Sequence, residues 1–308
     1  VEKYCVEYLS RYLVFTIPIL LMNNFTLYMI ASGKATLSLI CSVTGGLLNM
    51  ALDYLFIAVF HMGISGAAIA TGMGYSVTAV VGLFVFCRKK SLLHFQKPVF
   101  RWKVLVNAAA NGCSEMATAL VTGIITMMFN WTMLRYVGEN GVAAVTIIMY
   151  VLMFASSLYT GYSYGVAPMV SYYYGEGNHG KLKKLVGTSF RVIAFISIMT
   201  VAASFALTRP LVSVFARPDN PVYDLAVTGN RICTIALCFI GFNIFASGMF
   251  TALSNGVVSA VLAFSRSFVF MLAAMIVLPL LFGVNGIWLA TPAAELMALA
   301  LSAFMLRK

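Results

Sequence analysis

Residues 49–71, NMALDYLFIAVFHMGISGAAIAT, place one carboxylate inside a long apolar stretch. Met62 and Gly63 mark the expected turn of a helical hairpin, because apolar residues continue on both sides. Asp53 lies nine residues before Met62 and Thr71 lies nine after it. In an antiparallel pair of helices, that symmetry predicts the same depth for both side chains, about 14 Å from the turn. This depth is near the middle of a bilayer core about 30 Å thick.

Asn49 precedes Asp53 by four residues, so both side chains are predicted on one face of the first helix. A carboxylate at the centre of a membrane helix costs about 2.5–3.5 kcal/mol on insertion scales, and such groups usually handle an ion or a proton. The stretch therefore predicts an ion site formed by Asn49, Asp53 and Thr71. The alternative is a purely structural carboxylate held by the amide and the hydroxyl.

The composition is that of a membrane protein. Of the 308 residues, 61% are hydrophobic and only 9% are charged, and the mean hydropathy is +0.94. The net charge of +11 is distributed over short loops between apolar runs, which is unlike a nucleic-acid-binding surface, so we expect no nucleic-acid partner. The six cysteines lie singly in or beside apolar runs, and the three histidines are scattered. We therefore expect no disulfide framework, no transition-metal site and no cofactor.

Apolar runs separated by charged, Gly or Pro clusters predict nine transmembrane helices and an all-α, polytopic fold. The predicted spans are residues 4–31, 36–60, 64–87, 104–136, 142–174, 185–207, 223–253, 257–282 and 287–306. Residues 179–185 are expected to form a short basic helix that anionic lipid attracts to the membrane surface, or else a plain loop with solvated lysines.

The basic residues predict the orientation. The loops after spans 1, 3, 5 and 7, together with the C-terminus, carry twelve of the twenty basic residues, and the opposite side carries four. The richer side is expected to be cytoplasmic, which places the C-terminus in the cytoplasm and the protein in the cell membrane. An odd number of spans then leaves the N-terminus outside without a signal peptide. We therefore expect a segment to precede Val1.

An internal repeat agrees with that expectation. Residues 61–71 resemble residues 281–291 at an offset of 220, and Ser32–Gly33 resembles Ser254–Asn255 at an offset of 222. Spans 1–3 thus match spans 7–9 in the same direction, which predicts two parallel six-helix lobes with the first one incomplete. The expected organisation is residues 1–90 in the first lobe, 91–103 as a cytoplasmic linker and 104–308 in the second lobe. At the offset of 220, Ala273 and Val269 replace Asp53 and Asn49, so the acidic site is expected in the first lobe only.

Several motifs, in this order, resemble the multidrug and toxic compound extrusion (MATE) transporters. They are Asn49-x-x-x-Asp53, Met62-Gly63-Ile64-x-Gly66-Ala67-Ala68, Thr71, Gly161-Tyr-x-x-Gly165-x-x-Pro168-x-x-Ser171-Tyr172-x-Tyr174-Gly175 and Gly283-Val284-Asn285-Gly286-Ile287-Trp288. The resemblance covers the whole chain, which would correspond to helices 4–12 of a twelve-helix protein. It implies two six-helix lobes around a central cavity and drug export driven by protons or sodium ions. It also implies a cation site formed by Tyr8, Asn49, Asp53 and Thr71, together with an aspartate from a helix that would precede this sequence.

A polar stripe follows one face of residues 104–136 and suggests where a substrate binds. Its candidates are Asn111, Glu115, Thr122 and Asn130, with Glu115 offering a negative charge to cationic drugs. The alternative is that its threonines bond their own helix carbonyls and hold helices together. Arg266 and Glu295 are two further charges within predicted spans, and they are candidates for a pair between two helices.

The leading hypothesis is a monomeric secondary exporter of small cationic, lipophilic compounds, working against protons or sodium ions. The alternative is a flippase of the same superfamily for lipid-linked or polysaccharide precursors. An enzyme is not expected, because no nucleophile, histidine and acid cluster together in the sequence.

Overall fold

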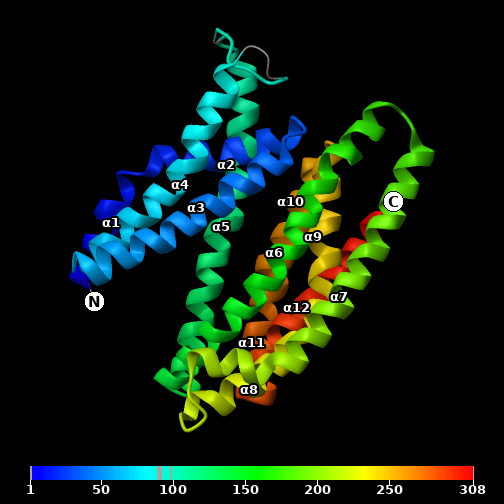
Figure 1. The fold of residues 1–308 in the computed structure, drawn as a ribbon. Helices are drawn as coiled ribbons and strands as arrows, with labels where there is room; N and C mark the ends of the chain where they lie inside the picture. The colour runs from blue at the N-terminus through cyan, green and yellow to red at the C-terminus, as the bar shows by residue number, and fades with distance from the viewer. Residues whose placement is uncertain (1, 89–91, 98, 308) are drawn as a thin grey trace. The chain divides into compact units, whose positions relative to one another are not determined.

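The computed structural model describes residues 2–88, 92–97 and 99–307, and its regular secondary structure in that part is helical (Figure 1). The chain forms two compact units, residues 1–100 and 101–308. The all-α, polytopic fold predicted from the sequence is confirmed. The assignment of these units to the two lobes of a longer protein stays a prediction.

The first unit contains four α-helices, of which α1, α2 and α3 pack on α4. Their bounds are α1 (Glu2–Leu13), α2 (Thr16–Ala31), α3 (Ala35–Asp53), which continues as the π-helix η1 (Tyr54–Val59), and α4 (Gly63–Cys87). The axes of α1 and α2 differ by 60° across a short break, and together the pair is long and apolar enough to be one candidate span. α4 contacts α1, α2 and α3.

The second unit contains the remaining helices. Their bounds are α5 (Trp102–Tyr136), α6 (Glu139–Gly175), α7 (His179–Phe215), α8 (Pro221–Thr234), α9 (Leu237–Ala252), α10 (Gly256–Phe264), the π-helix η2 (Ser265–Phe270), α11 (Met271–Phe282) and α12 (Val284–Arg307). The pair α8 and α9 is bent by 50°. The central helices of this unit are α6, α9 and α12, and α6 contacts α5, α7, α8 and α9. Its core includes the fully buried side chains of Tyr159 and Trp288.

Helical segments lie at all nine of the predicted spans. Within the described residues, six helices are long and apolar enough to cross a membrane, and the count rises to eight when each bent pair is one span. The remaining predicted span, residues 104–136, corresponds to α5, a single helix of 35 residues. A crossing by α5 stays a prediction.

One local prediction was wrong. Residues 179–185 do not form a separate surface helix or a loop, because His179 begins α7, which continues without a break to Phe215. The side chain of Asn178 accepts a hydrogen bond from the Lys181 backbone amide (3.1 Å) and caps the start of this long helix. Nothing after that cap ends the helix until Ala216, where the backbone becomes extended.

The turns at the ends of α2 and α9 show the internal repeat in the backbone. The amide of Lys34 bonds to the carbonyl of Met29 and the amide of Asn255 bonds to the carbonyl of Phe250, each five residues back. Gly33 (φ +77°) and Ser254 (φ +61°) stand at the same position of the two turns. The structure thus pairs Gly33 with Ser254, whereas the sequence match paired it with Asn255. The correct offset at this turn is therefore 221 residues.

Candidate functional site

A cavity of about 280 Å³ lies within the first unit, between α2, α3 and α4. It is lined by Met22, Ser42, Gly45, Gly46, Asn49, Thr71, Gly74, Tyr75 and Thr78. Glycines on α3 and α4 allow the two helices to meet beside it, since a Cβ on Gly45 would lie only 2.6 Å from the Gly74 carbonyl oxygen. Because Asn49 and Thr71 both line this cavity, two of the four residues predicted for the cation site share one space.

Asn49 and Thr71 are joined directly. The Asn49 side-chain amide donates to the Thr71 hydroxyl oxygen at 3.5 Å, which is a long hydrogen bond. The Thr71 hydroxyl in turn donates to the Ala67 carbonyl, one turn earlier in α4 (2.9 Å). These two bonds leave the Asn49 side-chain oxygen available to a ligand in the cavity.

Asp53 stands at the last position of α3, where the chain enters η1. Its Oδ1 atom is buried and has no hydrogen-bond partner among the described residues. A buried carboxylate oxygen without a partner is costly, so this atom is a place where a cation or a hydrogen-bond donor can bind. Asp53 itself is not among the residues that line the cavity.

The structure differs from the predicted depth symmetry. Thr71 bonds to Asn49, one turn before Asp53, although the spacing around Met62 placed Thr71 level with Asp53. Two features of the chain explain the shift. η1 is a π-helix, whose wider turns advance less along the axis per residue, and residues 60–62 form a turn outside both helices.

Tyr8, the fourth predicted member, lies on α1 and stacks against Tyr12 with 5.7 Å between the ring centroids. Within residues 2–88, no hydrogen bond connects it to Asn49, Asp53 or Thr71. The sequence reasoning missed its neighbour Glu7, whose carboxylate accepts a hydrogen bond from the Ser65 hydroxyl of α4 (2.7 Å). The presence of an acidic residue within the predicted span 4–31 could have identified Glu7 as a candidate.

The four candidates for the substrate cavity all lie on α5. The side chains of Asn111 and Glu115 lie outside the described residues. The Thr122 carbonyl accepts a bond from the Thr126 hydroxyl (2.9 Å), which is the carbonyl-satisfying arrangement considered as the alternative. Asn130 is half-buried. Binding of a substrate by this stripe stays a prediction.

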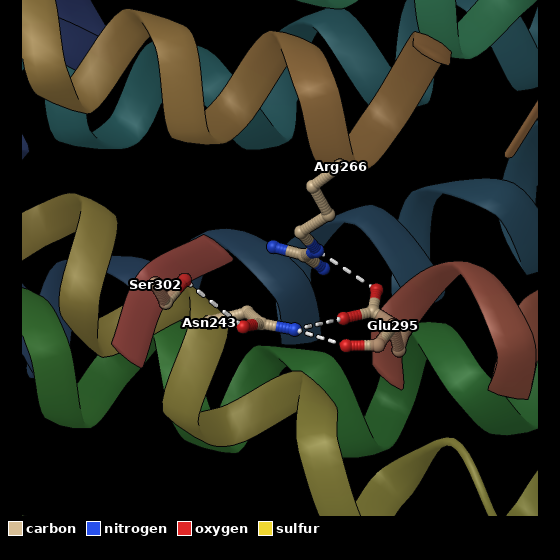
Figure 2. Close-up of polar contacts among 4 residues, drawn as sticks. All are labelled: Asn243, Arg266, Glu295 and Ser302. Atoms are coloured by element: carbon tan, nitrogen blue, oxygen red, sulfur yellow. Dashed lines mark hydrogen bonds and ion pairs between the residues drawn. The ribbon is translucent and has the colours of Figure 1, made fainter. Parts of the chain in front are cut away.

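The second unit contains a buried polar network centred on Glu295, and Figure 2 shows its members. The Arg266 guanidinium donates from Nε to Glu295 Oε1 at 2.8 Å, so the pairing predicted for these two residues is confirmed. Asn243 donates to both Glu295 Oε2 (2.8 Å) and the Glu295 carbonyl (2.9 Å). The Ser302 hydroxyl donates to Asn243 Oδ1 (3.2 Å). Glu295 is only 4% exposed. The sequence reasoning missed Asn243 and Ser302, which lie on α9 and α12.

Comparison with known proteins identifies the family of this chain. Residues 116–277 match the protein family MatE. The chain is 22% identical over 258 residues to the "Multidrug export protein MepA" of Staphylococcus saprophyticus, covering 83% of this chain and 55% of that protein. It is 23% identical over 275 residues to MepA of Staphylococcus aureus strain MRSA252, covering 88% and 60%. The chain thus spans little more than half the length of these relatives.

Solved structures agree on the fold. A crystal structure of MATE in complex with MaL6 superposes with a TM-score of 0.91 at 21% identity, covering 98% of this chain and 69% of that one. An outward-facing multidrug resistance MATE family transporter of the MOP superfamily gives 0.90 at 21% identity, covering 98% and 68%. A MOP superfamily transporter from Pyrococcus furiosus, described as having a binding pocket of reverse polarity that suggests a different function, gives 0.88 at 20% identity, covering 98% and 69%. Together with the family match over more than half of its residues, this shows that the chain belongs to the MatE family of membrane transporters.

Proposed function

We propose that this protein exports cationic, lipophilic compounds across the cell membrane and couples that export to inward movement of protons or sodium ions. The observation that carries the proposal is the group in the first unit: the Asn49–Thr71 pair at a cavity, with the unpaired Asp53 oxygen one helical turn away along α3. Family membership and the MepA relatives, which are named multidrug export proteins, support the export of drugs.

Each member of the group has a separate role in this proposal. Asp53 carries the negative charge that a proton or sodium ion neutralises. Asn49 supplies a neutral oxygen, and the Thr71 hydroxyl fixes the orientation of the Asn49 amide. Tyr8 closes the site from α1 when the ion is bound. Since the ion must favour one conformation over another in order to drive transport, its binding must change the packing between α1, α3 and α4.

The substrate would contact the polar face of α5, where Asn111, Glu115, Thr122 and Asn130 are the candidates. The protein works as a monomer in the lipid bilayer with its C-terminus in the cytoplasm, and it needs no cofactor besides the coupling ion.

Efflux from proteoliposomes tests the proposal. The protein, produced from its complete reading frame, is reconstituted, and the movement of a fluorescent lipophilic cation is followed under a proton gradient and then under a sodium gradient. We expect transport with one of the gradients, lost in Asp53→Asn and retained in the matched variant Asp219→Asn, whose carboxylate lies in the turn before α8. Normal efflux by Asp53→Asn would refute the coupling role. If neither gradient moves any cation, the flippase of the same superfamily becomes the better explanation.

A further inference from the structure

The turns of the two units determine which residues are equivalent. Gly33 and Ser254 occupy the same position of the first turn, 221 residues apart. Gly63 and Gly283 occupy the same position of the second turn, 220 residues apart, and both have φ +58°. Residues of α2 and α3 therefore correspond to residues 221 positions later, and residues of α4 to residues 220 positions later.

By these offsets, the residues of the Glu295 network are equivalent to residues that line the cavity of the first unit. Three residues that line the cavity are replaced by three members of the network: Met22 by Asn243, Gly45 by Arg266 and Tyr75 by Glu295. The first unit thus has open space where the second unit has a carboxylate and a guanidinium. At the offset of 221 the residues equivalent to Asp53 and Asn49 are Ala274 and Phe270, rather than Ala273 and Val269 as the sequence comparison gave, and neither belongs to the network.

The second unit satisfies its own charge. Glu295 has one carboxylate oxygen bonded to Arg266 and the other bonded to Asn243 (Figure 2). Arg266 belongs to η2, where the wider π-helical turn interrupts the regular helix between α10 and α11. An arginine side chain stays protonated in proteins, and it cannot leave the site as a free ion does.

We infer that Arg266 is a tethered cation that keeps the second unit permanently neutralised, so that only the first unit exchanges a coupling ion. The last clause rests on the proposed function, whereas the role of Arg266 stands on the geometry alone. Without the guanidinium, Glu295 would be a buried carboxylate whose remaining side-chain partner is the neutral Asn243 amide nitrogen. A buried carboxylate that has lost its cationic partner favours taking up a proton, or binding a hard monovalent cation such as sodium through its own oxygens.

Other charged groups on the helices packed around the network do not pair with it within the described residues. They are Lys103 and Arg135 on α5, Glu139 on α6, His179, Lys181, Lys183, Lys184, Arg191 and Arg209 on α7, Asp224 and Arg231 on α8, and Arg307 on α12. α5 also carries Glu115, whose side chain lies outside the description, so the test includes a variant of it.

Thermal unfolding of the purified protein in detergent tests the inference without measuring transport. The variants are Arg266→Gln, Arg266→Lys, Glu295→Gln and the double variant Arg266→Gln/Glu295→Gln. Each is unfolded over a pH series with potassium as the only alkali cation, and then at fixed pH with sodium replacing potassium at constant ionic strength. The Arg266→Gln series is repeated with Glu115→Gln added.

We expect Arg266→Gln alone to acquire a new cation dependence. If the site takes a proton, its melting temperature falls as the pH rises, and sodium has no effect. If the site takes sodium, replacing potassium by sodium raises the melting temperature at fixed pH. The wild type, Arg266→Lys and the double variant change in parallel and lack this dependence, and Glu115→Gln leaves it in place.

Two outcomes would overturn the inference. One is an Arg266→Gln variant that responds to pH and sodium as the wild type does. The other is an Arg266→Gln variant that folds under none of these conditions while the double variant folds under all of them, because the vacated site then takes no cation. Since transport is not measured, neither outcome affects the test of the proposed antiport. A failure of the Asp53→Asn test would remove the clause on ion exchange by the first unit and leave the role of Arg266 standing.

Discussion

Gly45 on α3 and Gly74 on α4 approach each other so closely that a Cβ on either residue would meet the carbonyl oxygen of the other, at 2.6 and 2.8 Å. The contact is backbone against backbone, so no side-chain rotation can relieve a clash. We expect Gly45→Ala to separate the two helices and to lower the free energy of unfolding by about 1–3 kcal/mol, the range for overpacking. Gly46→Ala is the matched control, because a Cβ there meets nothing within 4 Å. Thermal unfolding in detergent measures both variants, and equal melting temperatures would contradict the close contact.

The Tyr159 hydroxyl joins three helices of the second unit. It contacts the Thr200 hydroxyl of α7 (2.6 Å) and donates to the Leu237 carbonyl of α9 (3.1 Å), and its ring is fully buried. Tyr159→Phe is expected to lower the free energy of unfolding by about 1–3 kcal/mol, because the partner groups stay buried and lose a hydrogen bond. Tyr150→Phe is the control, since Tyr150 is half exposed and stacks its ring on Phe215. A loss of stability in Tyr150→Phe equal to that in Tyr159→Phe would assign the effect to the helix rather than to the hydroxyl.

The bond from Ser65 to Glu7 connects α4 to α1, the helix that carries Tyr8. Ser65→Ala removes the donor and leaves the half-buried carboxylate without it, so we expect a loss of about 1.5–3 kcal/mol in the free energy of unfolding, as for bonds to charged groups. Ser10→Ala is the control, because the Ser10 hydroxyl is exposed and bonds only to a backbone carbonyl on its own helix. Chemical denaturation in mixed micelles compares the two variants. A Ser65→Ala variant as stable as Ser10→Ala would show that the bond contributes nothing.

Cys87 tests the predicted orientation of the membrane helices. It is exposed at the last position of α4, beside Arg88, on the side predicted to be cytoplasmic. With Cys87 as the single cysteine, a membrane-impermeant maleimide should label inside-out vesicles and spare intact cells. A variant whose single cysteine is Cys233, which is buried, should react on neither side until the protein is denatured. Labelling of Cys87 in intact cells would reverse the assigned topology.

The sequence was sufficient for the spans because apolar length determines where a chain crosses a membrane, and the helices fall at the predicted positions. It could not locate the breaks within them. The bend between α8 and α9 follows Thr234, and no proline or glycine lies at that point of the sequence to indicate it. The sequence pattern did not predict the π-helices either. Because η1 shortens the segment after Asp53, Thr71 bonds to Asn49 and does not lie level with Asp53.

Part of the candidate site could be predicted from the spacing of its residues. The four-residue spacing and the short hairpin brought Asn49 and Thr71 together. The counterpart in the second unit was not predictable by comparing equivalent positions of Asp53, because the charges there come from Arg266 and Glu295, which align with Gly45 and Tyr75. Only the backbone turns give that alignment.

The lengths of α6 and α7 determine what the protein presents outside the lipid. Each has 37 residues, or about 55 Å of helix, against a hydrocarbon core of about 30 Å. Because Lys181, Lys183 and Lys184 all belong to the first turns of α7, we expect the excess length to extend past the membrane surface at the hairpin between α6 and α7. This end would then be a stiff surface exposed to water. An antibody fragment could grip it to follow movements of the second unit without entering the bilayer.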